Sequence, residues 1–187
     1  MNKKVMLALI GVFILGVFLI IGFSLTGNVT APGIVNLTVQ TYNNVTFTTD
    51  SINWGSGAVT GEYAILITNG SVEGGNWSSV DSGFILENVG NVNVILNVSF
   101  GKNATSFIGG TNPEYQFKVT NSEAGSCSLA VDEGVWYNAS TSSIRICDSF
   151  NYSESSDEIR IDLRLKIPID SRGGSMSDTI TLSQEAV

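Results

Sequence analysis

The chain has 187 residues, of which 43% are hydrophobic and 14% charged, and its 17 acidic and nine basic residues give a net charge of −8. It contains no histidine, which excludes Ser-His-Asp and Cys-His catalysis, histidine-ligated zinc sites and imidazole pH switches. The acidity opposes binding to nucleic acid or anionic lipid, because like charges repel.

The first predicted element is a membrane helix at residues 1–25, whose apolar part, residues 5–25, has no charged residue and follows Lys3 and Lys4. Twenty-one helical residues extend about 31 Å, close to the roughly 30 Å hydrocarbon core of a bilayer. The two lysines keep the N-terminus in the cytoplasm, so the chain from Thr26 onward is predicted to be extracytoplasmic, at the cell surface or secreted.

This segment is either an uncleaved signal-anchor or a cleaved signal peptide. The length favours the anchor, because the apolar core of a signal peptide has only about 7–15 residues. Small residues that suit a cleavage site do occur at 22–24 and 29–31. The partner of the helix is therefore the membrane, if the helix is retained.

A linker or extended arm is predicted at residues 26–33, TGNVTAPG, which are small and polar and include Pro and Gly. Residues 34–187 are enough for one ordinary domain and too few for two. Beyond the membrane segment seven basic residues stand against 17 acidic ones, so this part carries a charge of −10.

Short β-strands are predicted along the whole domain, because apolar and polar residues alternate with a period of two. The predicted strands are residues 35–39, 45–49, 63–68, two halves of 84–100, 115–120, 143–149, 159–170 and 179–183. Asn88, Gly90 and Asn91 lie between the halves of 84–100, and such residues tolerate the positive φ of a tight reversal or bulge.

Residues 159–170, IRIDLRLKIPID, show the clearest alternation in the chain. The aliphatic residues at odd positions are predicted to face a core and the charged residues at even positions to face solvent. Pro168 cannot donate a ladder hydrogen bond, which indicates a sheet edge or a bulge. With no apolar stripe of helical length beyond the membrane, the predicted fold class is all-β: an antiparallel β-sandwich, Ig-like or jelly-roll, preceded by one N-terminal hydrophobic helix.

The two cysteines, Cys127 and Cys147, lie in the part predicted to be extracytoplasmic, where thiols generally oxidise. We expect one disulfide, which on the chain-entropy model contributes about 3 kcal/mol for a loop of this length. Two free thiols or a thiolate metal site are the alternatives, but a metal site needs further ligands that the spacing does not supply.

The chain also carries an excess of the N-glycan acceptor triplet Asn-x-Ser/Thr. The nine asparagines are Asn28, Asn36, Asn44, Asn69, Asn76, Asn97, Asn103, Asn138 and Asn151. Those at 36, 44 and 97 fall on the polar phase of predicted strands, as a glycan requires. The alternative is that Asn, Ser and Thr are simply the polar residues of an exposed β surface.

Aromatic residues offer the main candidate ligand site. Trp77, Trp136 and Tyr137, with Trp54, could form a flat platform on which sugar rings stack, or they could plug the ends of the core. The acidic residues near 148–158 lack a calcium-loop spacing, and neither a G-x-S-x-G elbow nor a phosphate-binding Gly-rich loop is present. We therefore predict no catalytic residue, metal site, cofactor or enzymatic activity.

Two stretches carry a resemblance: FILENVGNVNVILNVSF is similar to a strand pair of prokaryotic extracytoplasmic Ig-like domains, and IPIDSRGGSMSDTITLS to the end of such domains. With the apolar N-terminal segment, the layout resembles the TasA/camelysin-like family, which includes archaeal bundling-pilus subunits that polymerise by donating a strand. The asparagine density and acidity also look archaeal. Camelysin is described as a metalloprotease, an activity not carried over because the chain lacks histidine.

Two hypotheses about function follow. The first is a non-enzymatic, N-glycosylated structural protein of the cell surface, a filament or coat subunit that self-assembles by strand donation from about residues 32–49. The second is a membrane-tethered carbohydrate-binding or adhesion module that uses the aromatic residues.

Overall fold

A computed structural model describes residues Leu37–Val187, and Gln40–Val187 form a compact unit. The predicted membrane helix at residues 1–25, the arm at 26–33, Asn28 and Asn36 lie outside the described residues. Between Leu37 and Val187 no helix has the length and apolar character needed to cross a bilayer.

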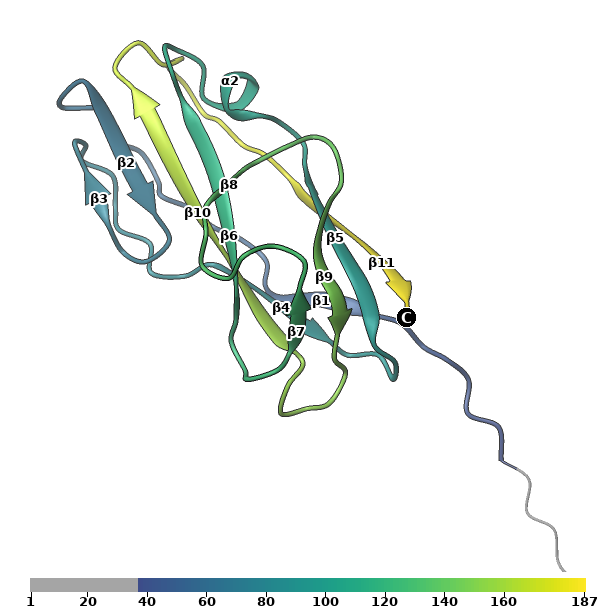
Figure 1. The fold of residues 1–187 in the computed structure, drawn as a ribbon. Coiled ribbons are helices and arrows are strands. Elements are labelled where there is room, and N and C mark those ends of the chain that lie inside the picture. The colour runs from purple at the N-terminus through teal and green to yellow at the C-terminus, as the bar shows by residue number, and fades with distance from the viewer. Residues whose placement is uncertain (1–36) are drawn as a thin grey trace, which may run out of the picture. The chain divides into compact units, whose positions relative to one another are not determined.

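The regular secondary structure of the described chain is almost entirely antiparallel strand, arranged in two sheets (Figure 1). The large sheet contains β1 (Val45–Thr49), β2 (Tyr63–Ile67), β3 (Val72–Glu73), β4 (Phe84–Asn88), β6 (Glu114–Asn121), β8 (Tyr137–Asn138) and β10 (Glu158–Pro168). The small sheet contains β5 (Val94–Phe100), β7 (Cys127–Leu129), β9 (Ile144–Phe150) and β11 (Ile180–Ala186). The predicted all-β, antiparallel class is therefore confirmed.

β10 is the central strand of the large sheet. One of its edges pairs with β6 from Ile159 to Lys166, whereas the other edge pairs first with β4 and then, from Arg164 to Pro168, with β2. The inward residues Ile159 to Ile167 at odd positions are at most 8% exposed. The predicted facing of these aliphatic residues is confirmed. The strand ends at Pro168 and not at residue 170. β10 is not an edge strand, but Pro168 pairs only with β2, since the pairing with β6 stops at Lys166.

The connection from β4 to β5 crosses between the sheets instead of forming a hairpin. Buried Asn88 holds this crossover, since its Nδ2 donates to the carbonyls of Val92 and Phe150, both at 3.0 Å, and its Oδ1 accepts from the Gly90 N–H at 3.1 Å. The asparagine and glycine of the predicted turn are thus used to change sheets.

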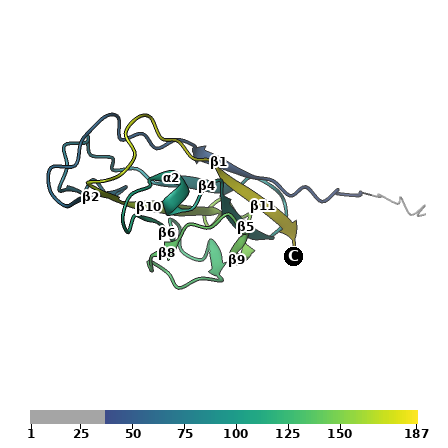
Figure 2. The ribbon, with the colours of Figure 1, turned by 90° about the horizontal axis from the view of Figure 1, so that it is seen from above.

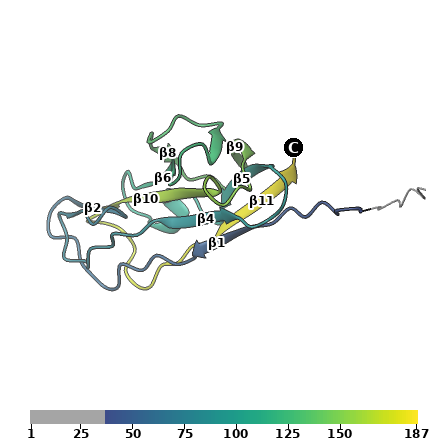
Figure 3. The same ribbon diagram turned by 90° about the horizontal axis from the view of Figure 1, so that it is seen from below.

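The two sheets pack through aromatic residues and approach each other again at one edge. Phe100 of β5 lies 5.2 Å from Phe117 of β6, ring centroid to ring centroid. At the edge, Gln184 of β11 accepts from the Val45 N–H at 2.8 Å and donates to the Asn43 carbonyl at 3.3 Å. Figures 2 and 3 show β1 and β11 side by side at this seam, where a side-chain amide bridges the two strands.

Some elements differ from the sequence-based predictions. The described part of the first predicted strand, residues 37–39, has no regular secondary structure. The two-residue strands β3 and β8 and the three-residue β7 were not predicted, because such short pieces show no alternation. A single helical turn, α2 (Ala104–Phe107), was also not predicted; Asn103 caps it by accepting from the Ser106 N–H at 2.9 Å.

Candidate functional site

Cys127 and Cys147 lie at disulfide distance, with their Cα atoms 5.8 Å apart. They belong to β7 and β9, which are neighbours in the small sheet, and their side chains are buried. The pair therefore ties a three-residue edge strand to its own sheet, unlike the disulfide that joins the two sheets of antibody domains.

The seven acceptor asparagines in the described chain all lie at least partly at the surface. Asn44, Asn97 and Asn151 are half-buried and the other four are exposed. Asn97 points out of the small sheet, because its neighbours Leu96 and Val98 are buried at 0% and 1% exposure. The positions satisfy the steric condition for a glycan; occupancy stays a prediction.

Several of these asparagines also serve the local fold through the side-chain oxygen. The Oδ1 atoms of Asn69, Asn76 and Asn103 accept from backbone N–H groups, and that of Asn138 accepts from the Gln116 amide. Such a bond leaves the nitrogen, where the sugar is attached, available. Asn151 differs, because its Nδ2 donates to the Ser156 hydroxyl at 2.9 Å.

The structure does not bring the candidate aromatic residues to one surface. Trp136 and Tyr137 lie at β8, where Lys118 Nζ is 5.0 Å from the Trp136 ring and the Tyr137 hydroxyl is 3.2 Å from an Asp132 carboxylate oxygen. Trp77 follows β3, on the opposite side of β10 in the strand order. Trp77 shares a cleft with Trp54 instead.

Main chain packs closely on Trp77. A Cβ atom at Gly57 or Gly75 would come within 2.4 Å or 2.7 Å of the indole ring, so only glycine fits at either position. Asn76 fixes this arrangement, since its Oδ1 accepts from the Ala58 N–H at 2.6 Å while its own N–H donates to the Ala58 carbonyl at 3.2 Å. Part of the Trp77 ring is therefore covered.

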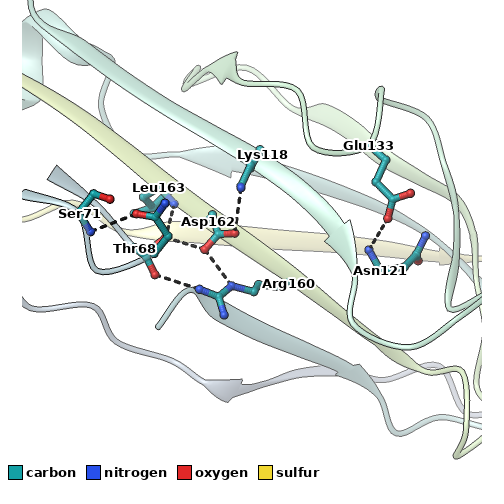
Figure 4. A network of polar contacts seen from close by, with 9 residues as sticks. Thr68, Ser71, Lys118, Asn121, Glu133, Arg160, Asp162 and Leu163 are labelled. Carbon is teal, nitrogen blue, oxygen red and sulfur yellow. Dashed lines mark hydrogen bonds and ion pairs between the residues drawn. The ribbon is translucent and has the colours of Figure 1, made fainter. Parts of the chain in front are cut away.

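A charged network on the outer face of the large sheet was missed by the sequence analysis. Asp162, predicted to face solvent, is only 5% exposed. Its Oδ1 accepts from Thr68 Oγ1 at 2.7 Å and Arg160 Nε at 2.8 Å, and its Oδ2 lies 3.7 Å from Lys118 Nζ (Figure 4). The Thr68 hydroxyl also accepts from the Leu163 N–H at 3.0 Å. The network therefore links the end of β2 to β10 at the position where the neighbour of β10 changes from β4 to β2.

Two carboxyl groups at opposite ends of β10 have shifted pKa values. Burial acts to raise the pKa of Glu114, but hydrogen bonds and charge from Arg164 and Lys166 together hold it below its usual range. Burial, followed by the charges of Glu87 and Glu123, raises the pKa of Asp157. The outer face is therefore electrostatically uneven along its length.

The cleft shared by Trp54 and Trp77 has a volume of about 990 Å³. Its floor includes Leu163, Leu165 and Ile167 of β10, and its walls come largely from the loops at residues 52–59 and 169–178. Two polar side-chain atoms of lining residues, Trp54 Nε1 and Asp178 Oδ2, are buried without a hydrogen-bond partner in the described part of the chain.

Within Leu37–Val187 no group of three His, Cys, Asp or Glu residues is arranged to hold a metal ion. Comparisons with protein-family models, with curated proteins and with solved structures give no match for this chain. Function must therefore be argued from the residues alone.

Proposed function

We propose that the protein is a non-enzymatic structural subunit of the cell surface, which assembles head to tail into a filament or coat. The observation that carries the proposal is the segment that precedes the compact unit. Leu37 is 85% and Val39 72% exposed, and they alternate with the polar Thr38 and Gln40. This is the pattern of a half-buried strand, yet the described segment has no strand partner.

The segment begins at a fixed point on the domain. Asn91 donates from Nδ2 to the Gln40 carbonyl at 2.8 Å and accepts at Oδ1 from the Tyr42 N–H at 2.6 Å. The residues before Gln40 are therefore the part available to another molecule. β1 already pairs with β4 in its own sheet, so the donated segment ends before Val45, short of the residue 49 expected from the sequence.

The strands at the seam offer a place for such a segment. β11 forms a strand ladder only with β5, and β1 only with β4, within the described chain. Between β1 and β11 themselves, only the Gln184 side chain makes hydrogen bonds among the described residues, to Val45 and Asn43, so a donated strand would enter at this seam. An unpaired edge presents N–H and C=O groups that a strand from a neighbour can satisfy. A contact of this head-to-tail kind does not close on itself and extends into a filament.

The location outside the cytoplasm is part of the proposal. It is supported by the apolar segment at residues 5–25, by the paired cysteines, and by surface acceptor asparagines. N-terminal sequencing and intact mass of the mature protein test it, because together they report cleavage and count glycans. A free arm requires cleavage near residue 31; a retained helix tethers the arm and hinders exchange.

Of the two predicted sandwich topologies, we propose the jelly roll. From β4 to β11, each strand lies in the other sheet from the strand that precedes it in the chain. The even-numbered strands follow the spatial order β4-β10-β6-β8 in the large sheet, and the odd-numbered strands follow β5-β9-β7 in the small sheet. Two interleaved sheets of this kind are what a rolled double Greek key produces. In an Ig-like domain, consecutive strands more often share a sheet.

The assembly test compares protein lacking residues 1–31 with protein lacking residues 1–39, by light scattering and negative-stain microscopy. We expect polymers from the first and folded monomers from the second. A matched pair refines the test: Leu37→Asp should prevent polymers, because it places a charge on the apolar phase, whereas Thr38→Asp should not. Monomers from the 1–31 deletion, or equal effects from the two substitutions, would contradict strand donation.

A further inference from the structure

The cleft next to β10 exists because the small sheet does not cover the whole inner face of the large sheet. In Figures 1–3, β2 lies at the end of the domain away from β5, β9 and β11. At that end the inward side chains of β10, from Leu163 to Ile167, meet loops in place of strands. Apart from Met176, the loop residues are small, with Gly55, Ser56 and Gly57 on one side and residues 173–177 on the other. They leave the space of about 990 Å³.

The cleft combines an aromatic lining with two polar atoms that have no partner. Trp54, Trp77, Phe84, Phe107 and Tyr115 all contribute to its surface. Of the buried side-chain nitrogen and oxygen atoms in the described chain, only Trp54 Nε1 and Asp178 Oδ2 lack a hydrogen-bond partner, and both residues line this cleft. Buried polar atoms are normally hydrogen-bonded, so each exception calls for an explanation, such as strain, a catalytic role, or a bound water or other small species.

The two atoms are chemically complementary. The indole nitrogen can only donate a hydrogen bond, and the carboxylate oxygen can only accept one. A hydroxyl group can satisfy both kinds of atom. The Tyr115 side chain lies at the same wall. Burial, the charge of the Asp178 carboxylate and a hydrogen bond with that carboxylate raise the pKa of Tyr115, so its hydroxyl stays protonated. Asp178 Oδ2 is the carboxylate atom that has no partner in the described part of the chain.

We infer that this cleft is a binding site for a neutral, polyhydroxylated ligand of the size of a hexose or a disaccharide. Its C–H faces would lie against the aromatic lining and its hydroxyl groups would meet Trp54 and Asp178. The volume is within the range of small-molecule sites. The Asp178 carboxylate disfavours anionic ligands of the same shape. Residues 37–39, the donated segment of the proposed assembly, are not part of the cleft.

Calorimetric titration of the protein lacking residues 1–39, which keeps the whole compact unit and is expected to be a folded monomer, with glucose, galactose, mannose, N-acetylglucosamine and their disaccharides tests the inference. We expect saturable millimolar binding of at least one neutral sugar. Trp54→Phe, which keeps an aromatic ring and removes the N–H, should weaken this binding about tenfold. Asp178→Asn should weaken it at least as much, because hydrogen bonds to charged groups are stronger.

Trp136→Phe is the matched control, since Trp136 lies outside the cleft, and it should leave the binding constant unchanged. Glucuronate, the anionic counterpart of glucose, should bind more weakly than glucose. Thermal unfolding of each variant shows whether it is folded, and the Asp178 variant gives an independent result if the Trp54 variant is not. The inference is overturned if no neutral sugar saturates the wild-type protein, or if Trp136→Phe weakens binding as much as the folded cleft variants do.

Discussion

The two halves of β10 have the same alternating sequence but different surroundings. Ile159 and Ile161, in the half that pairs with β4, are fully buried and do not line the cleft. Leu165 and Ile167, in the half that pairs with β2, are 5% and 8% exposed and form part of the cleft floor. Alternation therefore determines which way a side chain points, whereas distant segments determine what covers it.

The outer face of the same strand also changes along its length. Glu158 at the start of β10 pairs with Glu87 across the sheet. At the other end, Arg164 and Lys166 contact one carboxylate, that of Glu114. The first half is thus closely packed and begins with two adjacent carboxylates on its outer face, and the second is loosely covered and places two cations around one carboxylate.

The largest expected effect compares one substitution in the two halves, Ile161→Ala and Ile167→Ala. We expect Ile161→Ala to lower the free energy of unfolding by about 4 kcal/mol and Ile167→Ala by about 2 kcal/mol. The smaller cost at Ile167 follows because its side chain borders an existing space and loses fewer contacts. Denaturant titration of both variants measures the difference.

The two substitutions have the same residue type, strand and sheet face. The difference in β-sheet propensity between Ile and Ala therefore cancels when their free energies of unfolding are compared. Equal costs at the two positions would mean that the loops pack as tightly as the small sheet does. The contrast between the halves would then be wrong.

The second prediction concerns the disulfide. It joins β7 to β9 in the small sheet, which covers the closely packed half of β10. Replacing both Cys127 and Cys147 by alanine should lower the free energy of unfolding by about 3 kcal/mol. The reductant control should reproduce this loss in the wild-type protein and leave the double variant unchanged. Alkylation of either cysteine in the folded, unreduced protein would show that the bond does not form.

The third prediction addresses Asp162, at the point where the two halves meet. Asp162→Ala should cost about 2 kcal/mol, because Thr68 loses its acceptor and the charge of Arg160 its nearest partner. Asp148→Ala is the matched control, since Asp148 pairs with Arg145 at 3.2 Å but both side chains are more than half exposed. It should cost less than about 0.5 kcal/mol. A similar loss in both variants would mean that the network does not join β2 to β10.

The sequence predicted the strands that alternate clearly and the direction of their side chains. It could predict the cysteine pair because the two cysteines have no other partners. It could not predict that Asp162 is buried, because Thr68 and Lys118, 94 and 44 positions away in the chain, provide its surroundings. Charge at an even position normally indicates solvent, and here the neighbouring strands override that signal.

The cleft was equally hidden in the sequence. Trp54 and Asp178 are far apart in the sequence, near the beginning and the end of the domain. Both lie in loops, which show no apolar periodicity. The glycines beside Trp77 were the one available signal, since a Gly-rich loop next to a tryptophan indicates close approach of main chain to a ring. That signal does not identify Trp54 as the second tryptophan of the cleft.

The smallest expected effect separates the two ends of the outer face by pH. Because the pKa of Glu114 is lowered in the folded state, its ionised form stabilises the fold above the ordinary carboxyl pKa, and this contribution disappears as the pH falls through the lowered value. Because the pKa of Asp157 is raised, its ionised form costs stability at neutral pH, and the cost disappears as the pH falls through the raised value.

Glu114→Gln should therefore lower the free energy of unfolding at pH 7, and Asp157→Asn should raise it, each by about 0.5 kcal/mol. Both differences should shrink at a pH below the two pKa values and, for partly exposed Glu114, in high salt. Urea titrations at neutral and acidic pH measure them, and changes of the same sign in the two variants would show that the charge on the outer face does not divide along β10.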